Sequence, residues 1–349
     1  MQNKFFTIIL PIYNPTKLKR ALDSIESQPN KKDIEVIIVN DNGSRDFEKI
    51  LSDYTFNYKV IHNQTNLGQG LARQVGIDNS DGEWITFLDH DDEFNPNCFK
   101  AVKDDIIASD CIFLYSTQSL IANGYSFAEK QDFAVEDSGS VLHGHFYNRK
   151  MLEHYNIRFT EKVRAHEDTY FLNCVEGILL LDKSLGETAK ICSPLVTYYW
   201  YLWEDSTSHS YNGGISYLED TIHDYLTAMW ESFIHTTLYC KITDEYMYVK
   251  LCGTLMCTYW FEQSFKYLNP MGWKMENETY IKDFVIKVMR RFNLTDIAEL
   301  TNVLLDLPEL FTMSYKGTLA NVDGAFVPRE TIEQFYQNLF KEENKNDVQ

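Results

Sequence analysis

Apolar stretches of strand length alternate with helical patterns through the first quarter of the chain, and this alternation constrains the fold most strongly. The expected strands and helices lie at residues 5–12, 17–27, 34–39, 58–62, 70–79 and 83–88, the second and fifth of these being the helices. Strands separated by helices of this length form right-handed βαβ units with parallel strands in one sheet. The pattern therefore predicts an α/β fold in which helices flank a largely parallel sheet.

Three of these predicted strands end abruptly in polar side chains. Tyr13-Asn14 follows the first strand, Asp41-Asn42 the second, and Asp89-His90-Asp91-Asp92 the last. Ligands of such sheets bind at the carboxyl ends of the strands, so we expect these side chains to meet. Three carboxylates within four residues repel one another unless a cation lies among them, and hard divalent cations prefer carboxylate ligands. A metal site is therefore indicated, with a solvated acidic turn as the alternative interpretation.

The later part of the chain has a different character. We predict a further strand at residues 106–119 and a polar, glycine-punctuated connection at residues 121–139. Amphipathic helices are then expected at residues 215–238, 245–267, 280–292 and 331–340. We place a domain boundary at Gly213-Gly214, which separates a first domain, residues 1–213, from a helical, aromatic-rich domain, residues 214–349.

Composition excludes several classes of protein. A chain of 349 residues with 44% apolar residues can bury a substantial core in one or two domains. Its 32 basic and 51 acidic residues give a net charge of −19, which argues against a general nucleic-acid or anionic-membrane binder. No apolar stretch approaches the roughly 18 residues of a membrane helix, and no signal-peptide pattern is present. We therefore expect a cytoplasmic protein whose seven cysteines are reduced and mostly buried.

Several well-known catalytic motifs are absent from the sequence. Gly68-Gln69-Gly70 begins like a dinucleotide-binding fingerprint, but the third glycine would fall on Arg73. His166-Glu167-Asp168 begins like a zinc-protease helix and lacks the second histidine. The chain also has no phosphate-binding loop and no G-x-S-x-G nucleophile elbow. These absences argue against a nucleotide-dependent dehydrogenase, a zinc protease and an α/β hydrolase.

Five short segments together resemble the family 2 glycosyltransferases, which bind a nucleotide sugar with the GT-A fold. In chain order they are Leu10-Pro11-Ile12-Tyr13-Asn14, Ile37-Ile38-Val39-Asn40-Asp41-Asn42-Gly43-Ser44, Asn66-Leu67-Gly68-Gln69-Gly70-Leu71-Ala72-Arg73, Leu88-Asp89-His90-Asp91-Asp92 and His166-Glu167-Asp168. The resemblance covers roughly residues 4–210 and implies a mixed, mostly parallel GT-A sheet. One departure is Gln74, where asparagine is commoner. A second is the absence of a basic residue in the aromatic segment before Ser206, which leaves open the group that holds the diphosphate beside the metal.

The resemblance also implies a donor site for a nucleotide sugar, by default a UDP-hexose. Its contacts would come from Pro11, Tyr13, Asn14, Asp41, Arg73, Asp89, His90 and Asp91. Tyr13 would stack on the base, Asp41 would accept a hydrogen bond from it, and Arg73 would reach the base or the phosphates. The plainer interpretations are strand-end packing for Tyr13, a turn or helix cap for Asp41, and a surface helix for Arg73.

The implied cofactor is Mn²⁺ or Mg²⁺, held by Asp89 and Asp91, with Asp92 in support. His209 would join as a metal ligand after its loop closes, although a surface histidine is the alternative. Asp168 is the implied catalytic base, which takes the proton from the acceptor hydroxyl in a single displacement with inversion. Without that role, Glu167-Asp168 is an acidic pair that favours a helix N-terminus.

The leading hypothesis is thus a metal-dependent, inverting glycosyltransferase whose acceptor is a hydroxyl on a glycan, polymer or protein. The helical domain would build the acceptor surface or a homo-oligomer interface. A nucleotidyltransferase would need a basic, glycine-rich loop where Tyr13-Asn14-Pro15-Thr16 stands. A non-catalytic nucleotide-sugar-binding or scaffold protein with the same fold is the alternative from a different class.

Overall fold

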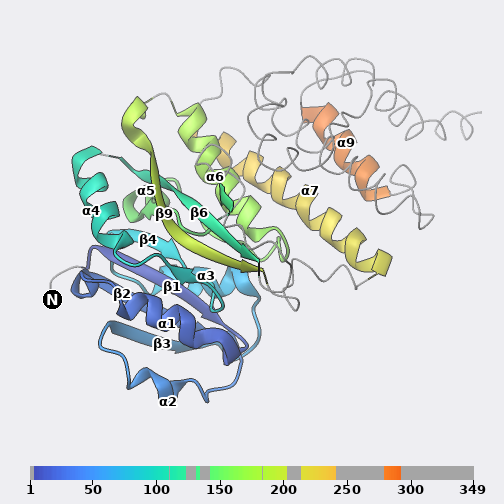
Figure 1. The fold of residues 1–349 in the computed structure, drawn as a ribbon. Coiled ribbons are helices and arrows are strands. Elements are labelled where there is room, and N and C mark those ends of the chain that lie inside the picture. Colours follow the sequence, from blue (N-terminus) through green and yellow to red (C-terminus); the bar gives the residue numbers. More distant parts are fainter. Residues whose placement is uncertain are drawn as a thin grey trace, which may run out of the picture. The chain divides into compact units, whose positions relative to one another are not determined.

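The computed structural model describes residues 4–109, 111–122, 131–133, 142–182, 184–202, 214–240 and 279–291 (Figure 1). The chain divides into two compact units, Met1–Ser210 and Tyr211–Gln349. In the second unit, helices α7 (Gly214–Tyr239) and α9 (Thr279–Arg291) contact each other, which confirms two of the four predicted helices. The other two fall outside the described residues. No described helix is both long and apolar enough to cross a membrane.

The first unit contains one mixed sheet, whose first half is parallel as predicted. Its strands follow the order β3 (Asn57–His62), β2 (Ile34–Asn40), β1 (Phe6–Ile12) and β4 (Trp84–Phe87). Helix α1 (Leu18–Glu26) packs on one face and α3 (Gln69–Asp78) on the other. Ile8 and Leu10 of β1 point into the cluster with α1, whereas Ile9 lies against Gly76 of α3. Because both faces are covered, β1 is apolar at almost every position rather than alternating.

Pro11 lies inside this central strand, where a proline normally removes a ladder hydrogen bond. The Ile9 carbonyl accepts from the Leu88 N–H on the β4 side, whereas the Ile12 carbonyl accepts from Asp41 on the β2 side. The backbone nitrogen of Pro11 faces the same edge of the strand as the Ile9 carbonyl, and on that side β4 has already ended at Phe87. The missing N–H therefore costs no hydrogen bond, and it marks where the strands separate around the site.

The second half of the sheet is mixed and was predicted less well. Beyond β4 the order is β8 (Phe146–Asn148), β6 (Phe113–Ala122), β9 (Lys190–Leu202) and β5 (Glu93–Phe94), and β7 (Gln131–Phe133) pairs with β6. β6 and β9 run in the same direction as β1, and β8, β5 and β7 run oppositely. The remaining elements are η1 (Pro15–Lys17), η2 (Lys31–Asp33), α2 (Glu48–Leu51), α4 (Cys98–Ser109), α5 (Arg149–His154), α6 (Glu167–Leu181) and η4 (Glu187–Ala189).

The predicted strand at residues 106–119 begins too early. Ile106 belongs to α4, where it is buried together with Val102 one helical turn before it. Only Ser109 and Asp110 interrupt the apolar residues between Ile106 and Phe113, so the sequence gives little sign that a helix ends and a strand begins. The predicted connection at residues 121–139 is also wrong in part, because it contains the end of β6 and all of β7.

Candidate active site

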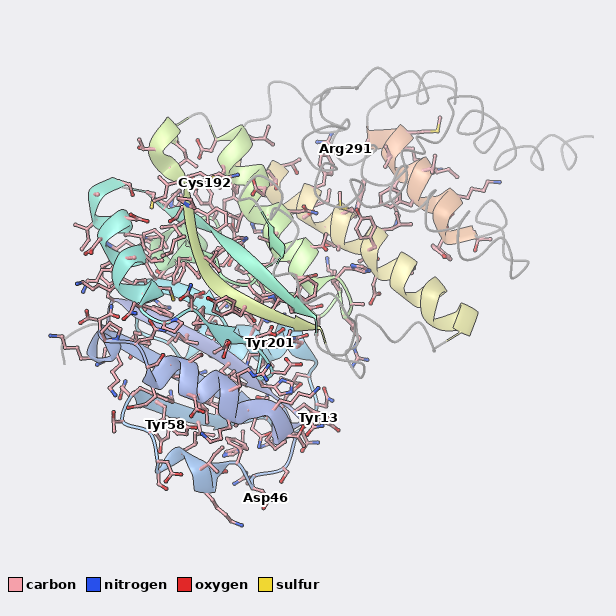
Figure 2. All side chains as sticks on the ribbon, viewed as in Figure 1. Tyr13, Asp46, Tyr58, Cys192, Tyr201 and Arg291 are labelled. Atoms are coloured by element: carbon pink, nitrogen blue, oxygen red, sulfur yellow. The ribbon has the colours of Figure 1, made fainter. Side chains whose placement is uncertain are left out.

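The loops that follow β1 and β2 lie against each other at the carboxyl edge of the sheet. Tyr13 is 57% exposed just beyond β1 (Figure 2). A Cβ at Gly43 would lie 2.0 Å from the Tyr13 carbonyl oxygen, so only glycine permits this approach. The side chain of Asn40 accepts from the Gly43 N–H at 2.8 Å, and Asn14 accepts from the Thr16 N–H at 3.3 Å. Short-range hydrogen bonds therefore shape both loops and leave the Tyr13 ring accessible.

Asp41 is buried and its carboxylate binds neighbouring backbone. Oδ1 accepts from Asn63 Nδ2 and from the Leu67 N–H, and Oδ2 accepts from the Gly68 N–H, each at 2.9 Å. Gly68 immediately precedes α3, so Asp41 anchors the loop that enters this helix, although it does not cap the helix itself. Its contact with a base stays a prediction, for which one acceptor position of Oδ2 remains.

The glycines of α3 explain why the sequence imitates a dinucleotide-binding fingerprint. Gly68 has a φ of 83°, a conformation that glycine adopts without strain. A Cβ at Gly70 would lie 2.7 Å from Cγ of Glu167, and one at Gly76 would lie 2.4 Å from Cγ2 of Ile9. The glycines therefore let α3 approach β1 on one side and the start of α6 on the other. They serve helix packing in this chain.

Arg73 projects from α3 into a fully buried position, with 1% of its surface exposed. Its Nη2 lies 3.0 Å from Oδ1 of Asp89, and its Nη1 lies 2.9 Å from Oε1 of Glu167. Burial alone would lower the pKa of Arg73, but the two carboxylates outweigh it and raise that pKa. The surface-helix interpretation of Arg73 is wrong, because the charged end is enclosed. A direct contact with the nucleotide stays a prediction.

Asp89 collects several donors at the end of β4. Besides Arg73, Gln69 Nε2 donates to Oδ1 at 2.9 Å, and His143 Nε2 lies 3.0 Å from Oδ2. Burial alone would raise the pKa of Asp89, but the charges of His143 and Arg73 hold it well below its usual range. Conversely, Asp89 raises the pKa of His143 against the effect of burial. Asp89 thus favours the charged form of His143, whereas Arg73, whose Nη2 lies 3.2 Å from Nε2 of His143, opposes it.

His143 is a site residue that the sequence prediction left out. It belongs to none of the recognisable motifs of the sequence. Its ring stacks on the ring of Tyr198 in β9, and the two ring centroids are 5.4 Å apart. The Tyr198 hydroxyl accepts from the Asp89 N–H at 3.2 Å and donates to Oδ2 of Asp92 at 2.7 Å. Only the pairing of β9 with β6 and β5 brings these residues together.

The other two carboxyl groups of the acidic run are in different environments. Asp92 is buried and accepts from the Tyr201 N–H at 2.8 Å, and burial together with the charge of Asp89 raises its pKa to about 8. Asp91 is half-buried, and burial and the nearby Asp89 raise its pKa, although His90 and Lys17 oppose the shift. Asp91 accepts no hydrogen bond from another residue of the described part.

A divalent cation fits the environment of Asp91, because a partly buried carboxylate without a partner binds a cation more readily than a paired one. In the part of the chain that the structure describes, no three His, Cys, Asp or Glu side chains converge as a ready-made metal cluster. His209, the third predicted ligand, lies outside the described residues. The predicted metal site thus stays a prediction, with Asp91 as the best-placed ligand.

Asp168 lies in the first turn of α6. The helix follows His166, whose φ of 61° is left-handed, and this turn of the chain presents Glu167 and Asp168 at the helix start. Oδ1 of Asp168 accepts from the Thr169 N–H at 2.7 Å, and the side chain is half-buried. Burial and the adjacent Asp168 raise the pKa of Glu167. The charge of Asp168 also contributes to the raised pKa of Arg73, after the charges of Asp89 and Glu167.

A family model described as glycosyl transferase family 2 matches residues 7–184. This span contains the site residues described above from Tyr13 to Asp168. The chain belongs to glycosyl transferase family 2. The parallel strands bring Tyr13, Asp41 and Asp89, which all lie within this span, to one edge of the sheet.

Similar proteins include bacterial glycosyltransferases. Glycosyltransferase GlyA of Streptococcus pneumoniae is 27% identical over 47% of this chain and 21% of its own length. The minor teichoic acid biosynthesis protein GgaA of Bacillus subtilis is 28% identical over 53% of this chain and 45% of its own length. The chain thus spans less than half the length of these relatives.

Solved structures of S. aureus TarS 1–349 resemble this family 2 enzyme in fold. The complex with UDP-GlcNAc has a TM-score of 0.62 at 18% identity and covers 98% of this chain and 92% of TarS 1–349. The complex with UDP has a TM-score of 0.59 at 18% identity over 99% and 92% of the two chains. The predicted GT-A fold, a mixed sheet between helices with a helical part after it, is confirmed.

Proposed function

We propose that this family 2 enzyme transfers a hexose from a UDP-hexose to a hydroxyl of a glycan, polymer or protein, with a divalent metal and with inversion. The observation that carries the proposal is the meeting of an exposed Tyr13, the anchored Asp41 loop and the carboxylates of Asp89 and Asp91 at one sheet edge. The resemblance to TarS, which was solved with UDP and with UDP-GlcNAc, supports the choice of nucleotide.

On this proposal the donor lies across the ends of β1, β2 and β4. The Tyr13 ring stacks on the base, which needs an accessible aromatic face, and Asp41 accepts a hydrogen bond from it. Asp91, with Asp89 and His209 in support, would hold a divalent cation, and this cation would supply positive charge for the departing diphosphate. Arg73 and His143 hold Asp89 ionised and fixed in orientation, because both of its oxygens are engaged.

The acceptor side of the proposed reaction centres on Asp168. Its carboxylate takes the proton from the acceptor hydroxyl, whose oxygen forms a bond to the anomeric carbon. The bond between that carbon and the diphosphate breaks on the opposite face, and the diphosphate leaves with the electron pair. A single displacement of this kind inverts the anomeric configuration, as in inverting glycosidases.

The test begins with the wild-type chain and a set of UDP-sugars, with Mn²⁺ and with chelator. We expect one sugar to raise the melting temperature when Mn²⁺ is present, because a ligand of the native state stabilises it. The same sugar should be hydrolysed slowly, with release of UDP, and transferred when an acceptor is supplied. Binding and hydrolysis that persist in chelator would reject the metal, and a product with retained configuration would reject the mechanism.

A matched pair of variants separates a specific carboxylate effect from a loss of charge. Asp91→Asn should remove Mn²⁺-dependent binding. Asp46→Asn should bind as wild type does, since Asp46 is highly exposed on the loop before α2. Equal loss in both variants would assign the effect to the overall charge of the surface.

A further inference from the structure

We propose that Arg73 is a positioning residue that joins the donor carboxylate Asp89 to the helix carrying the base Asp168. The inference rests on the proposed function for the role of Asp168. Arg73 reaches both sides because its guanidinium presents two separate N–H ends. One end lies on Asp89, which follows β4, and the other on Glu167, the residue immediately before Asp168.

The position of Arg73 on α3 makes this bridge specific. Gln69 and Arg73 are one helical turn apart and both donate to Oδ1 of Asp89. One turn of α3 therefore fixes Asp89 at two points. The same turn contains Gly70, against which the side chain of Glu167 packs so closely that a Cβ would come within 2.7 Å. α3 thus holds the donor carboxylate and the start of α6 with adjacent residues.

Charge balance explains why the bridge persists. The guanidinium of Arg73 lies between two carboxylates, Asp89 and Glu167, whose side chains are largely buried. Removing one partner from a buried ion pair leaves an uncompensated charge, which is strongly destabilising. The guanidinium therefore has no equally good alternative position. Asp89 fixes the position of Arg73, and Arg73 in turn fixes the position of Glu167.

The functional consequence concerns the geometry of Asp168. A general base must lie within hydrogen-bonding distance of the proton that it accepts, and a misplacement of about 1 Å can cost about 10²-fold in rate. Asp168 directly follows Glu167 in the chain, so the bridge fixes the position of the base relative to the donor site. A lysine at position 73 keeps the positive charge but, as a single compact ammonium, cannot span both carboxylates.

The experiment compares wild type with Arg73→Lys. We expect the turnover number of the variant for transfer to fall at least about tenfold, and by a larger factor than its affinity for UDP with Mn²⁺. Hydrogen exchange supplies a readout that does not depend on activity. The Tyr170 N–H, which donates to the His166 carbonyl at 3.0 Å in the first turn of α6, should exchange faster in the variant.

Arg158→Lys is the matched control. Arg158 is half exposed and forms an ion pair with Asp78, which belongs to α3 as Arg73 does. It should match wild type in UDP binding, turnover and exchange at Tyr170. The proposal is overturned if Arg73→Lys turns over within threefold of wild type, or if exchange at Tyr170 is unchanged.

Should Arg73→Lys fail to fold, Glu167→Met tests the same bridge from the other end. This substitution keeps the size of the side chain and the pairing of Arg73 with Asp89, and it removes the acceptor on α6. Lower turnover with unchanged UDP binding supports the proposal, and unchanged turnover overturns it. If wild type transfers no sugar at all, the proposed function has failed, and exchange at Tyr170 still decides the inference.

Discussion

The two halves of the candidate site are built in different ways. Apart from Asp41, whose carboxylate binds residues 22 to 27 positions away, the strand-tip loops, residues 13–14 and 40–44, are shaped by hydrogen bonds between residues two to four apart, such as Gly43 to Asn40. The buried ion cluster, Arg73, Asp89, His143 and Glu167, joins residues 16 to 94 positions apart. Recognition of a nucleotide can therefore be altered locally, whereas the chemistry depends on the packing of several elements at once.

The largest expected effect concerns Asp91, which lies between the two halves. Asp91→Ala should abolish transfer and Mn²⁺-dependent binding of UDP-sugars. The apoprotein should melt at the same temperature or higher, because burial and Asp89 already disfavour the charged form of Asp91. Calorimetry and a transfer assay check both expectations. A lower melting temperature would show that Asp91 supports the fold in the same way as the buried ion cluster.

Asp168 provides the next test, because it separates chemistry from donor binding. Asp168→Asn should lower the turnover number by about 10²-fold while the dissociation constant of UDP stays within a few-fold. The amide keeps the shape of the side chain and cannot accept the proton. Rapid-quench kinetics and titration calorimetry measure the two quantities. Retained turnover would place the base elsewhere.

Tyr13 tests the independence of the strand-tip loops. Tyr13→Ala should weaken UDP binding about 5- to 30-fold, since stacking of a base on an aromatic ring contributes about 1–2 kcal/mol. Stability should change little, because the ring is exposed. Tyr58→Ala is the control, since Tyr58 is also partly exposed but lies at the start of β3. Equal loss of UDP affinity in both variants would show that Tyr13 has no specific role.

The smallest expected effect concerns a carboxylate of the scaffold, Glu26 at the end of α1. Partial burial would raise its pKa, but hydrogen bonds from Lys31 and Thr55 lower that pKa to about 2. A lowered pKa contributes stability that is present above the unfolded value of 4.5 and is lost as the pH falls toward 2. Glu26→Gln should thus cost about 1–2 kcal/mol at pH 7, after allowance for solvent exposure.

The stability difference between wild type and Glu26→Gln should close as the pH falls from 4.5 to 2. Denaturant unfolding at a series of pH values measures it. UDP binding at pH 7 should be unchanged, because Glu26 ties α1 to the Thr55 N–H and lies on neither half of the site. A difference that is constant with pH would mean that Glu26 acts through packing alone.

Much of the first half of the fold followed from the sequence. The apolar runs at β1, β2 and β4, the half-exposed strand β3 and the helical pattern of α3 were predicted within one or two residues of their observed bounds. Such elements carry their own signal, because a buried parallel strand is apolar throughout and ends at polar residues. α4 was missed and β6 misplaced, because only Ser109 and Asp110 separate the apolar residues of the helix from those of the strand, too short a polar gap to mark a change of element.

The sequence by itself determined which residue types stand at the strand ends, since Tyr13, Asp41 and Asp91 follow apolar runs that have to be buried. Only the tertiary structure decided how those groups are charged and held. The sequence left Arg73 either as a donor contact or as a surface residue, and it proved to be buried, because Gly70 and Gly76 let α3 sink between β1 and α6. His143 was not among the predicted site residues, since its contact with Asp89 exists only once the strands of the second half are aligned. Contacts between residues distant in sequence leave no periodic trace, and the ionisation of a buried group depends on just those contacts.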